Sequence, residues 1–360
     1  MKGVDANLVD NLESALKLDY PNFEIILSVA DRNDPAIEVV KELMKNYPNV
    51  EVRLVVGESH FGVNPKVNNL LTSYSIAKHE IVWILDSNIY VKPDTLGRAV
   101  DCLMQPNVGL VHHIPIGVRP ESFGTAVEQV YLNTCHAKIY TMVNKLKLGS
   151  CVIGKSNMFR KSELDHVGGL AYFGKFMSED NIMGRSIWDQ KRLHVIPADV
   201  VYQPLGKSGL TDYFKRRARW TRMRKFMDIA AVMLEPFTEC LLNGVVSSYA
   251  FSYFFGIPRL SFFVGHVLCW FLSDLLLGLA IEKSMVTDNF LRFVAAWIMR
   301  EISTLPVHLH ACAGSSVEWR GAPFRLQPDG TVAPSEKKAS RGLSLVGALL
   351  NKLVVKTKEE

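Results

Sequence analysis

The sequence predicts an α/β fold with a mostly parallel sheet covered by helices on both faces, followed by apolar helices that adjoin a membrane. Two patterns predict this architecture. Between residues 20 and 235, segments rich in β-branched residues alternate with helical segments, and repeated β-α-β-α order is typical of parallel sheets. From residue 237 onward the chain instead carries three long apolar stretches. At 360 residues the chain is long enough for two such parts.

The predicted elements alternate in order along the chain. The first five are a strand within 23–30, a helix that begins near Pro35, a strand at 50–56, a helix at 64–77 and a strand at 81–85. Beyond these we expect a strand at 108–118, one long helix or two shorter ones at 122–146, a strand and short helix at 150–164, and a loop and helix at 168–193. The acidic start of the last helix, at Glu179 and Asp180, suits the positive end of the helix dipole.

The apolar stretches cover residues 237–255, 260–281 and 290–313, each near the ~20 residues that span a hydrocarbon core. Ionisable side chains interrupt all three: Glu239, His266, Asp274, Arg292, Arg300 and Glu301. Such groups are costly at membrane depth unless they are paired, so we expect some stretches to tilt, re-enter or pack against the rest of the protein. Buried helices of a second soluble domain are the alternative.

These patterns divide the chain into a cytosol-facing domain at 1–235, a membrane-embedded helical region at 236–315 and a polar, basic tail at 316–360. The tail contains an amphipathic stretch, LSLVGALLNKLVVK. The net charge is a mild +5, and the basic residues concentrate at 215–225, directly before the first apolar stretch. This position predicts a cytosolic catalytic side and argues against nucleic acid. Six cysteines without a Cys-x-x-Cys pair, and the absence of a signal peptide pattern, favour a reducing compartment. The sequence leaves the oligomeric state open.

A charged residue ends the apolar strand at 81–85. In open α/β sheets, ligands bind outside the carboxyl ends of the strands, and Asp86 occupies such a position. Asn88 lies two residues further, so alternation along extended backbone directs both side chains to one side. Carboxylate and amide oxygens suit a hard cation, and we therefore expect Asp86 and Asn88 to hold a Mg²⁺ or Mn²⁺ ion that bridges a diphosphate.

Further polar residues complete this hypothesis. Lys66, Arg216 and Arg219 are candidates for the remaining phosphate charge, because arginine binds phosphate oxygens bidentately. Asp180 is left to take a proton from an acceptor hydroxyl as general base, although a carboxylate at this place is more often a helix cap. Together the metal, the diphosphate contacts and the base predict group transfer from a nucleotide-activated donor.

The order of aspartates, DSN, EDN and RRARW resembles the spaced aspartates and (Q/R)xxRW signature of inverting glycosyltransferases with the glycosyltransferase-A fold. More narrowly, the segments KGVDANL, LDYPNFEI, DPAI, YPNVEVRL and GVNPKVNNL resemble the ceramide glucosyltransferase family. The similarity runs from Lys2 to about Leu326. It implies transfer of glucose from UDP-glucose to ceramide, in a Golgi or endoplasmic reticulum membrane.

The resemblance also implies residue roles. Asp34 would lie in the nucleotide pocket, Asp86 would contact the metal and diphosphate, and Asp180 would be the base. The signature residues that would close over the diphosphate and acceptor are Arg216, Arg219 and Trp220. His136 matches a histidine near the active site of the family, although a single histidine on a helix is more often structural.

The chain departs from the family pattern in two ways. DSN stands where many relatives have Asp-x-Asp, and family members carry a membrane anchor and a first strand ahead of the segment that begins here at Lys2. We therefore expect a neighbouring strand to lack that partner. Two alternatives stay open: a non-catalytic or truncated paralogue, and a processive β-glycan synthase-like transferase, for which three irregular apolar stretches are few and Arg216 replaces a glutamine.

Overall fold

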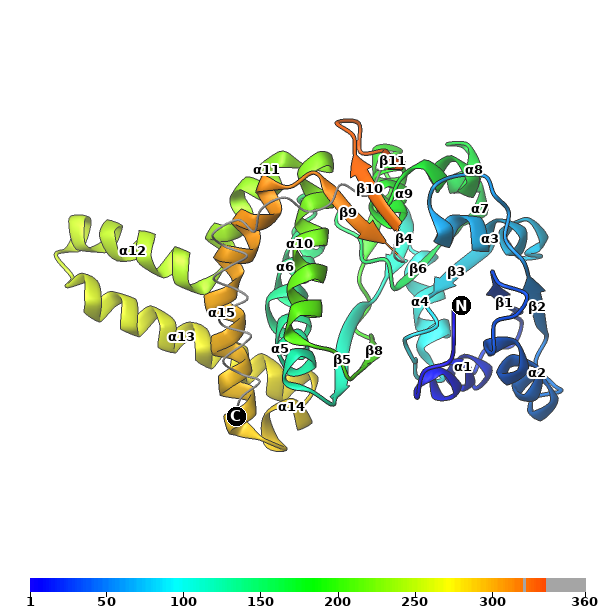
Figure 1. The fold of residues 1–360 in the computed structure, drawn as a ribbon, viewed down its shortest axis with the longest axis horizontal. Coiled ribbons are helices and arrows are strands. Elements are labelled where there is room, and N and C mark those ends of the chain that lie inside the picture. Colours follow the sequence, from blue (N-terminus) through cyan, green and yellow to red (C-terminus); the bar gives the residue numbers. More distant parts are fainter. Residues whose placement is uncertain (320–321, 335–360) are drawn as a thin grey trace. The chain divides into compact units, whose positions relative to one another are not determined.

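A computed structural model describes residues 1–319 and 322–334 (Figure 1). The predicted amphipathic stretch of the tail lies outside these residues. By internal contacts the chain divides into two units: the first comprises Met1–Ile116 and Ala137–Pro204, and the second comprises Gly117–His136 and the chain from Leu205 onward. All six cysteines lie in the described residues and are free thiols.

The first unit contains a four-stranded sheet and a separate parallel pair of strands. The sheet has the order β3 (Ile81–Leu85), β6 (Ser156–Arg160), β4 (Val108–His112) and β7 (Leu193–Val195). β4 pairs parallel with β7, and β6 pairs antiparallel with both β3 and β4. Three of the four strands therefore run in one direction, which confirms the mostly parallel α/β prediction, and β6 is the exception.

The helices of the first unit are, in chain order, α1 (Leu8–Leu16), α2 (Ala36–Asn46), α3 (Pro65–Ile76), α4 (Thr95–Leu103), α6 (Ala137–Lys145), α7 (Lys161–Asp165), α8 (Gly169–Tyr172), the 3₁₀ turn η2 (Phe173–Lys175) and α9 (Glu179–Asp189). The sequence pattern predicted α2, α3, α6, α7 and α9. It did not predict α1 or α4, which are short amphipathic helices in segments that also carry several polar residues.

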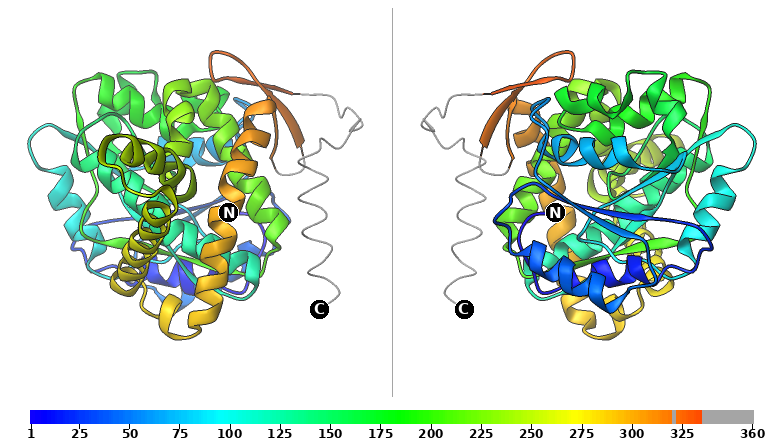
Figure 2. Two further views of the ribbon diagram at one scale, coloured as in Figure 1. Left: turned by 90° about the vertical axis from the view of Figure 1, so that its left-hand side faces the viewer. Right: turned by 90° about the vertical axis from the view of Figure 1, so that its right-hand side faces the viewer.

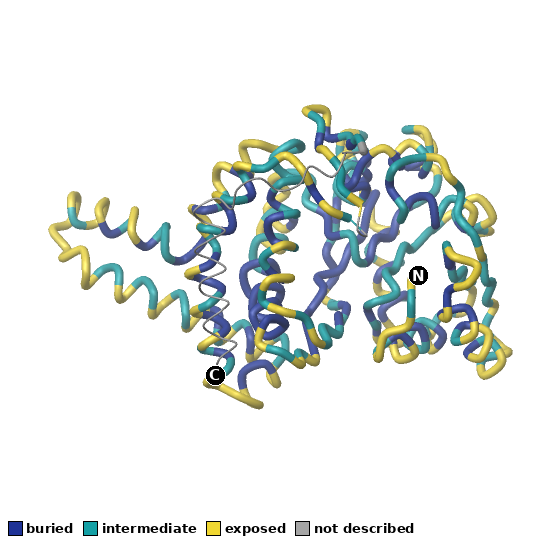
Figure 3. Tube along the Cα trace, in the orientation of Figure 1, coloured by how far each residue is buried: buried dark blue, intermediate teal, exposed yellow. Residues whose placement is uncertain are grey.

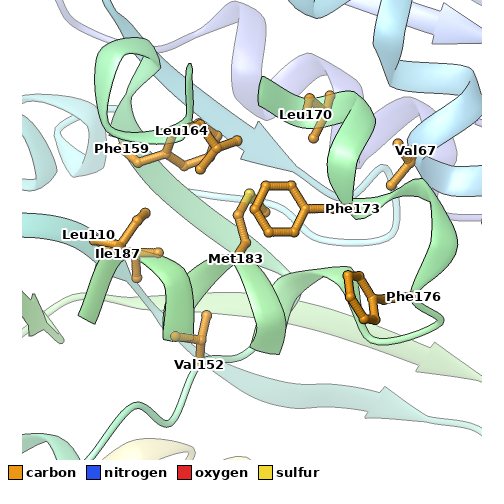
Figure 4. Close-up of a cluster of buried hydrophobic side chains, with 10 residues drawn as sticks. All are labelled: Val67, Leu110, Val152, Phe159, Leu164, Leu170, Phe173, Phe176, Met183 and Ile187. Atoms are coloured by element: carbon orange, nitrogen blue, oxygen red, sulfur yellow. The ribbon is translucent and has the colours of Figure 1, made fainter. Parts of the chain in front are cut away.

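Helices cover both faces of the four-stranded sheet. Side chains alternate along each strand: Phe159 of β6 faces a cluster with α3, α8 and α9, whereas its neighbour Met158 faces α4. Figure 4 shows the first cluster, in which Phe159, Leu164 and Phe173 lie around Met183 of α9. This packing holds the start of α9 close to the end of β3 and the start of β6.

The parallel pair consists of β1 (Ile25–Val29) and β2 (Val52–Val56), which pack with α1 and α2 around a cluster that includes Leu12, Val40 and Leu43. In the described part of the chain β1 pairs with β2 alone, and β3 pairs with β6 alone. Each thus keeps one edge without a strand partner. That one of these edges is where the family's first strand would pair stays a prediction.

The predicted strand at 108–118 is two strands, because β4 ends at His112 and β5 (Ile114–Pro120) follows. β5 pairs with β8 (Val200–Gly206) in a two-stranded sheet. The second unit then consists mainly of helices: α5 (Phe123–Tyr131), the π-helical turn η1 (Leu132–His136), α10 (Leu210–Met227), α11 (Ile229–Leu234), the 3₁₀ turn η3 (Glu235–Thr238), α12 (Cys240–Phe255), α13 (Arg259–Ile281), α14 (Ser284–Thr287) and α15 (Phe290–Ala313). The chain continues into an antiparallel sheet, β9 (Ser316–Trp319), β10 (Ala322–Leu326) and β11 (Val332–Pro334), which follows one end of α15 (Figure 2).

The three apolar stretches form α12, α13 and α15, close to their predicted bounds. Among the described residues, α13 is the one helix long and apolar enough by itself to cross a membrane. The bent pair Ile229–Thr238 and Cys240–Phe255, with 76° between its halves, counts as a broken span or a re-entrant loop. α12 and α13 pack side by side as a hairpin whose surface is largely exposed (Figure 3). α15 instead packs against α5 and α10, as expected for an apolar stretch interrupted by charges.

Three of the ionisable groups within the apolar stretches form ion pairs with one another. Arg300 of α15 is fully buried, and its guanidinium lies 3.0 Å from Asp274 Oδ2 of α13 and also contacts Glu301 and Thr134. The indole of Trp297 donates to the same Asp274 oxygen at 2.8 Å. These bonds link α13, α15 and η1 within the second unit.

The two units do not follow the predicted domain boundaries at 235 and 315. α10, which the sequence analysis assigned to the catalytic domain, packs on α15, so contacts group it with the apolar helices. Contact grouping measures packing, whereas the predicted domains concern the membrane position of each part. The division into 1–235, 236–315 and 316–360 therefore stays a prediction.

Candidate active site

The reversed direction of β6 brings two distant segments together at one edge of the sheet. Leu85, the last residue of β3, pairs with Ser156, the first residue of β6. The next residues outward are Asp86 and Lys155, and the amide of Asp86 donates to the carbonyl of Lys155 at 3.0 Å. An antiparallel strand thus begins where β3 ends, and it places a lysine beside Asp86.

Asp86 is held between two lysines. Its Oδ1 lies 3.0 Å from the ammonium of Lys66, and its Oδ2 lies 3.0 Å from the ammonium of Lys155. Burial would raise the pKa of the Asp86 carboxyl, but the charges of Lys66 and Lys155 outweigh this effect and lower the pKa to about 2. Asp86 is therefore a carboxylate at any physiological pH.

Asn88 joins this arrangement from a turn that follows β3, not from the extended backbone that the sequence analysis expected. Its Oδ1 accepts a hydrogen bond from Lys155 Nζ at 3.0 Å, so oxygens of Asp86 and Asn88 converge on the ammonium of Lys155. The described residues contain no group of three or more His, Cys, Asp or Glu side chains arranged for a metal ion. Mg²⁺ needs only one or two protein oxygens when substrate phosphates and water supply the others, and this convergent pair fits that requirement.

Lys66 is positioned by the start of α3. Asn64 caps this helix: its Oδ1 accepts from the amides of Lys66 (2.8 Å) and Val67 (3.2 Å). Its Nδ2 donates to Glu179 Oε2 at 2.7 Å and so links the starts of α3 and α9. The ammonium of Lys66 also donates to the carbonyl of Gly154 at 2.9 Å and lies 3.3 Å from Glu179 Oε1.

Asp180 lies in the first turn of α9, against Gly154 in the loop before β6. A Cβ atom added to Gly154 would overlap the Asp180 carboxylate, so only glycine leaves room for it. Burial, and next the charge of Glu179, raise the pKa of Asp180 to about 7, although Lys66 acts in the opposite direction. Such a carboxyl group can accept and release a proton near neutral pH, which general-base catalysis requires.

The structure therefore brings together Asp86, Asn88, Lys66 and Asp180 from the predicted site. Sequence analysis did not predict roles for Lys155, Gly154 and Asn64, and it assigned Glu179 only to the helix dipole. The Asn-Pro pair before α3 was a signal for the cap. Lys155 could have been found only by assigning β6 as antiparallel. A parallel β6 would begin beside the start of β3, far from Asp86.

Asp34 lies elsewhere in the first unit, in the loop after β1. Its Oδ1 accepts from the amide of Ala36 at 2.9 Å, and its Oδ2 accepts from the amide of Gly3 at 2.7 Å. Burial acts to raise the pKa of Asp34, but these two hydrogen bonds outweigh it and lower the pKa. Its contact with a nucleotide stays a prediction.

The remaining predicted residues belong to the second unit. Arg216 of α10 forms an ion pair with the buried Glu128 of α5, and the guanidinium of Arg219 lies 5.8 Å from the ring centre of Trp319. The rings of Trp220 and His136 lie 6.0 Å apart. The two candidate acceptor residues are thus neighbours.

Tyr131 is a neighbour of both: its ring centre is 6.3 Å from that of Trp220 and 5.6 Å from that of His136. The guanidinium of Arg217 lies over the ring of Tyr131, with its Cζ 3.6 Å from the ring centre. Arg217 is nearly buried and also lies 3.4 Å from Glu235. Sequence analysis passed over Arg217 because it occupies a variable position of the signature.

Around the end of β3 the α/β fold gathers a carboxylate, two lysines and a second carboxyl with a pKa near neutrality, an arrangement suited to holding an anionic ligand and to moving a proton. A family model of glycosyl transferase family 21 matches residues 1–332, and the chain belongs to this family. The predicted glycosyltransferase class is thereby confirmed.

Curated relatives share most of the chain. It is 34% identical to a "Ceramide glucosyltransferase" of Komagataella phaffii, over 91% of this chain and 81% of the relative. It is 29% identical to "Ceramide glucosyltransferase 3" of Caenorhabditis elegans, over 92% and 72% of the two chains. Among solved structures, a mannosyltransferase from Pyrobaculum calidifontis in complex with GDP-Man and Mn²⁺ is similar with a TM-score of 0.48 and 18% identity, over 84% of this chain and 86% of that chain.

Proposed function

We propose that the protein transfers glucose from UDP-glucose to the primary hydroxyl of ceramide, with inversion at the anomeric carbon, and so makes glucosylceramide. Family membership and the names of the fungal and nematode relatives support the substrates. The observation that carries the chemistry is the convergence of Lys66 and Lys155 on Asp86, next to the Asp180 carboxyl.

In the proposed reaction Asp180 accepts the proton of the ceramide hydroxyl while that oxygen attacks the anomeric carbon of glucose. The bond from this carbon to the UDP oxygen breaks on the opposite face, and its electron pair leaves with the diphosphate. Lys66 and Lys155 balance the diphosphate charge. Glu179 and Asn64 hold Lys66 in place, and Gly154 leaves the space that the Asp180 carboxylate needs.

Asp86 and Asn88 would hold a Mg²⁺ or Mn²⁺ ion, which when bound supplies positive charge to the leaving diphosphate. We assign Asp34 to the uridine, and Arg216 and Arg219 to further donor contacts. Trp220 and His136, whose rings are neighbours, are the proposed acceptor contacts.

We further propose that the enzyme resides in a Golgi or endoplasmic reticulum membrane with its catalytic domain on the cytosolic face. The apolar α13 supports membrane association, and a lipid acceptor requires it. The arginines and lysines of α10 precede the first apolar helix, which by the positive-inside rule favours the cytosolic face.

A transfer assay tests the proposal. The chain in nanodiscs would receive radiolabelled UDP-glucose, Mn²⁺ and short-chain ceramide, with UDP-galactose as the competing donor. We expect a single β-linked glucose on ceramide. A polymeric product would favour the processive alternative, and no product under any condition would favour a non-catalytic paralogue.

A further inference from the structure

Lys155 presents a cation at the point where two candidate metal ligands converge. Its ammonium lies 3.0 Å from both Asp86 Oδ2 and Asn88 Oδ1. Two oxygens from residues two apart on the chain thus already share one positive centre. A divalent cation at Asp86 and Asn88 would have to take these same oxygens.

The two lysines at Asp86 differ in how they are held. Lys66 also binds the carbonyl of Gly154 and lies near Glu179, and its backbone is fixed in the capped first turn of α3. Lys155 precedes β6 in a loop, and its ammonium reaches Asp86 and Asn88 across a flexible four-carbon stem. Its side chain keeps 24% of its surface exposed, so the ammonium has a route to solvent or to a ligand.

The charges around Asp86 are already close to balance. Lys66 lies in the field of three carboxyl groups, Asp86, Glu179 and Asp180, and Lys155 adds a second positive charge. A divalent cation arriving alone would have to displace the ammonium of Lys155 from these oxygens and would leave that ammonium without an anionic partner. A cation that arrives with a diphosphate brings compensating negative charge, to which the displaced lysine can turn.

We propose that Lys155 occupies, with its ammonium, the position that the divalent cation takes when the donor is bound, and thereby makes cation binding depend on the donor diphosphate. This inference rests on the proposed function, because it assumes a cation at Asp86. In the resting protein Lys155 holds the oxygens of Asp86 and Asn88 in ligand positions. In the donor complex it releases them and binds phosphate oxygens. By linkage, UDP and the cation each raise the affinity for the other.

Binding of Mn²⁺ to the full chain in detergent tests this inference without any turnover. Free Mn²⁺ would be measured by electron paramagnetic resonance with and without UDP. For the wild-type protein we expect UDP to lower the dissociation constant of Mn²⁺ about tenfold or more. For Lys155→Met and Lys155→Gln we expect Mn²⁺ to bind about tenfold more tightly without UDP, so that the effect of UDP largely disappears.

Two further variants make the result specific. Lys155→Arg keeps the positive charge and should keep the wild-type dependence on UDP. Lys41→Met removes an exposed lysine of α2 that pairs with Glu38, and it should leave both dissociation constants unchanged.

The possible failures are distinguishable. If Mn²⁺ binds with UDP but the Met and Gln variants behave like the wild type, or if Lys155→Arg behaves like them, the role of Lys155 is overturned and the cation at Asp86 stands. If the wild-type protein binds no Mn²⁺ even with UDP, the proposed cation is overturned together with the inference.

Discussion

Two clusters of opposite charges in this protein have similar chemistry and different surroundings. In the first unit, Lys66 and Lys155 flank Asp86, and these side chains keep 23–24% of their surface exposed. In the second unit, Arg300 and Asp274 keep 1% and 0%. Partly exposed charges can exchange one partner for another at small cost, whereas fully buried charges lose several kcal/mol when a partner leaves. The first cluster therefore suits a ligand site, and the second suits a fixed joint between helices.

The largest expected effect concerns the base of the first cluster. Asp180→Asn should lower kcat about a thousandfold, because the amide cannot accept the proton of the acceptor. Donor binding should largely persist, since Lys66 and Lys155 remain. A radiolabelled transfer assay measures kcat, and titration calorimetry with UDP measures donor binding. A variant that keeps most of its activity would show that another group is the base.

The second cluster should respond in stability. Arg300→Met should lower the free energy of unfolding by about 3–5 kcal/mol, because Asp274 and Glu301 would keep buried charges without their cation. Lys155→Met should change it by no more than about 1 kcal/mol, because its pair is partly exposed. Denaturant unfolding of both variants in detergent makes this comparison. Equal losses would mean that exposure does not separate the two clusters.

A smaller effect should follow from crowding the base. Gly154→Ala places a methyl group where the Asp180 carboxylate lies and should lower kcat about 10- to 100-fold by displacing it. Gly149→Ala is the matched control in the same loop, because nothing lies within 4 Å of its added Cβ. Unfolding curves of both variants would verify that the fold is retained. Similar kcat values for the two variants would contradict the assigned place of Asp180.

The smallest effect is a shift in pH dependence. Asp180 must be ionised to act as a base, so kcat should rise with pH through the pKa of about 7. Glu179→Gln removes a negative charge that helps to raise this pKa, and the rise should move to lower pH. Asp189→Asn changes an exposed carboxylate at the far end of α9 and should leave the profile in place. An unmoved profile in Glu179→Gln would show that Glu179 does not set the ionisation of Asp180.

Sequence patterns were reliable where local periodicity or composition decides the structure. The β-branched run at 81–85, the helix after Pro35 and the three apolar stretches all appear close to their predicted bounds. They failed where an element is short or where a strand could pair in either direction. The segment at 108–118 became two strands, and β6 runs against its neighbours, because both outcomes depend on pairing with residues far away in the chain.

The sequence by itself determined that Asp86 follows a buried strand and that Asp180 opens a helix, because apolar runs and capped helices are fixed by neighbouring residues. Only the tertiary structure decided which cations meet Asp86 and why Asp180 has a pKa near neutrality. Lys155 is 69 residues from Asp86, and it reaches that carboxylate because β6 starts at the end of β3. Burial and the electric field of distant charges are sums over the folded molecule, and no local pattern contains them.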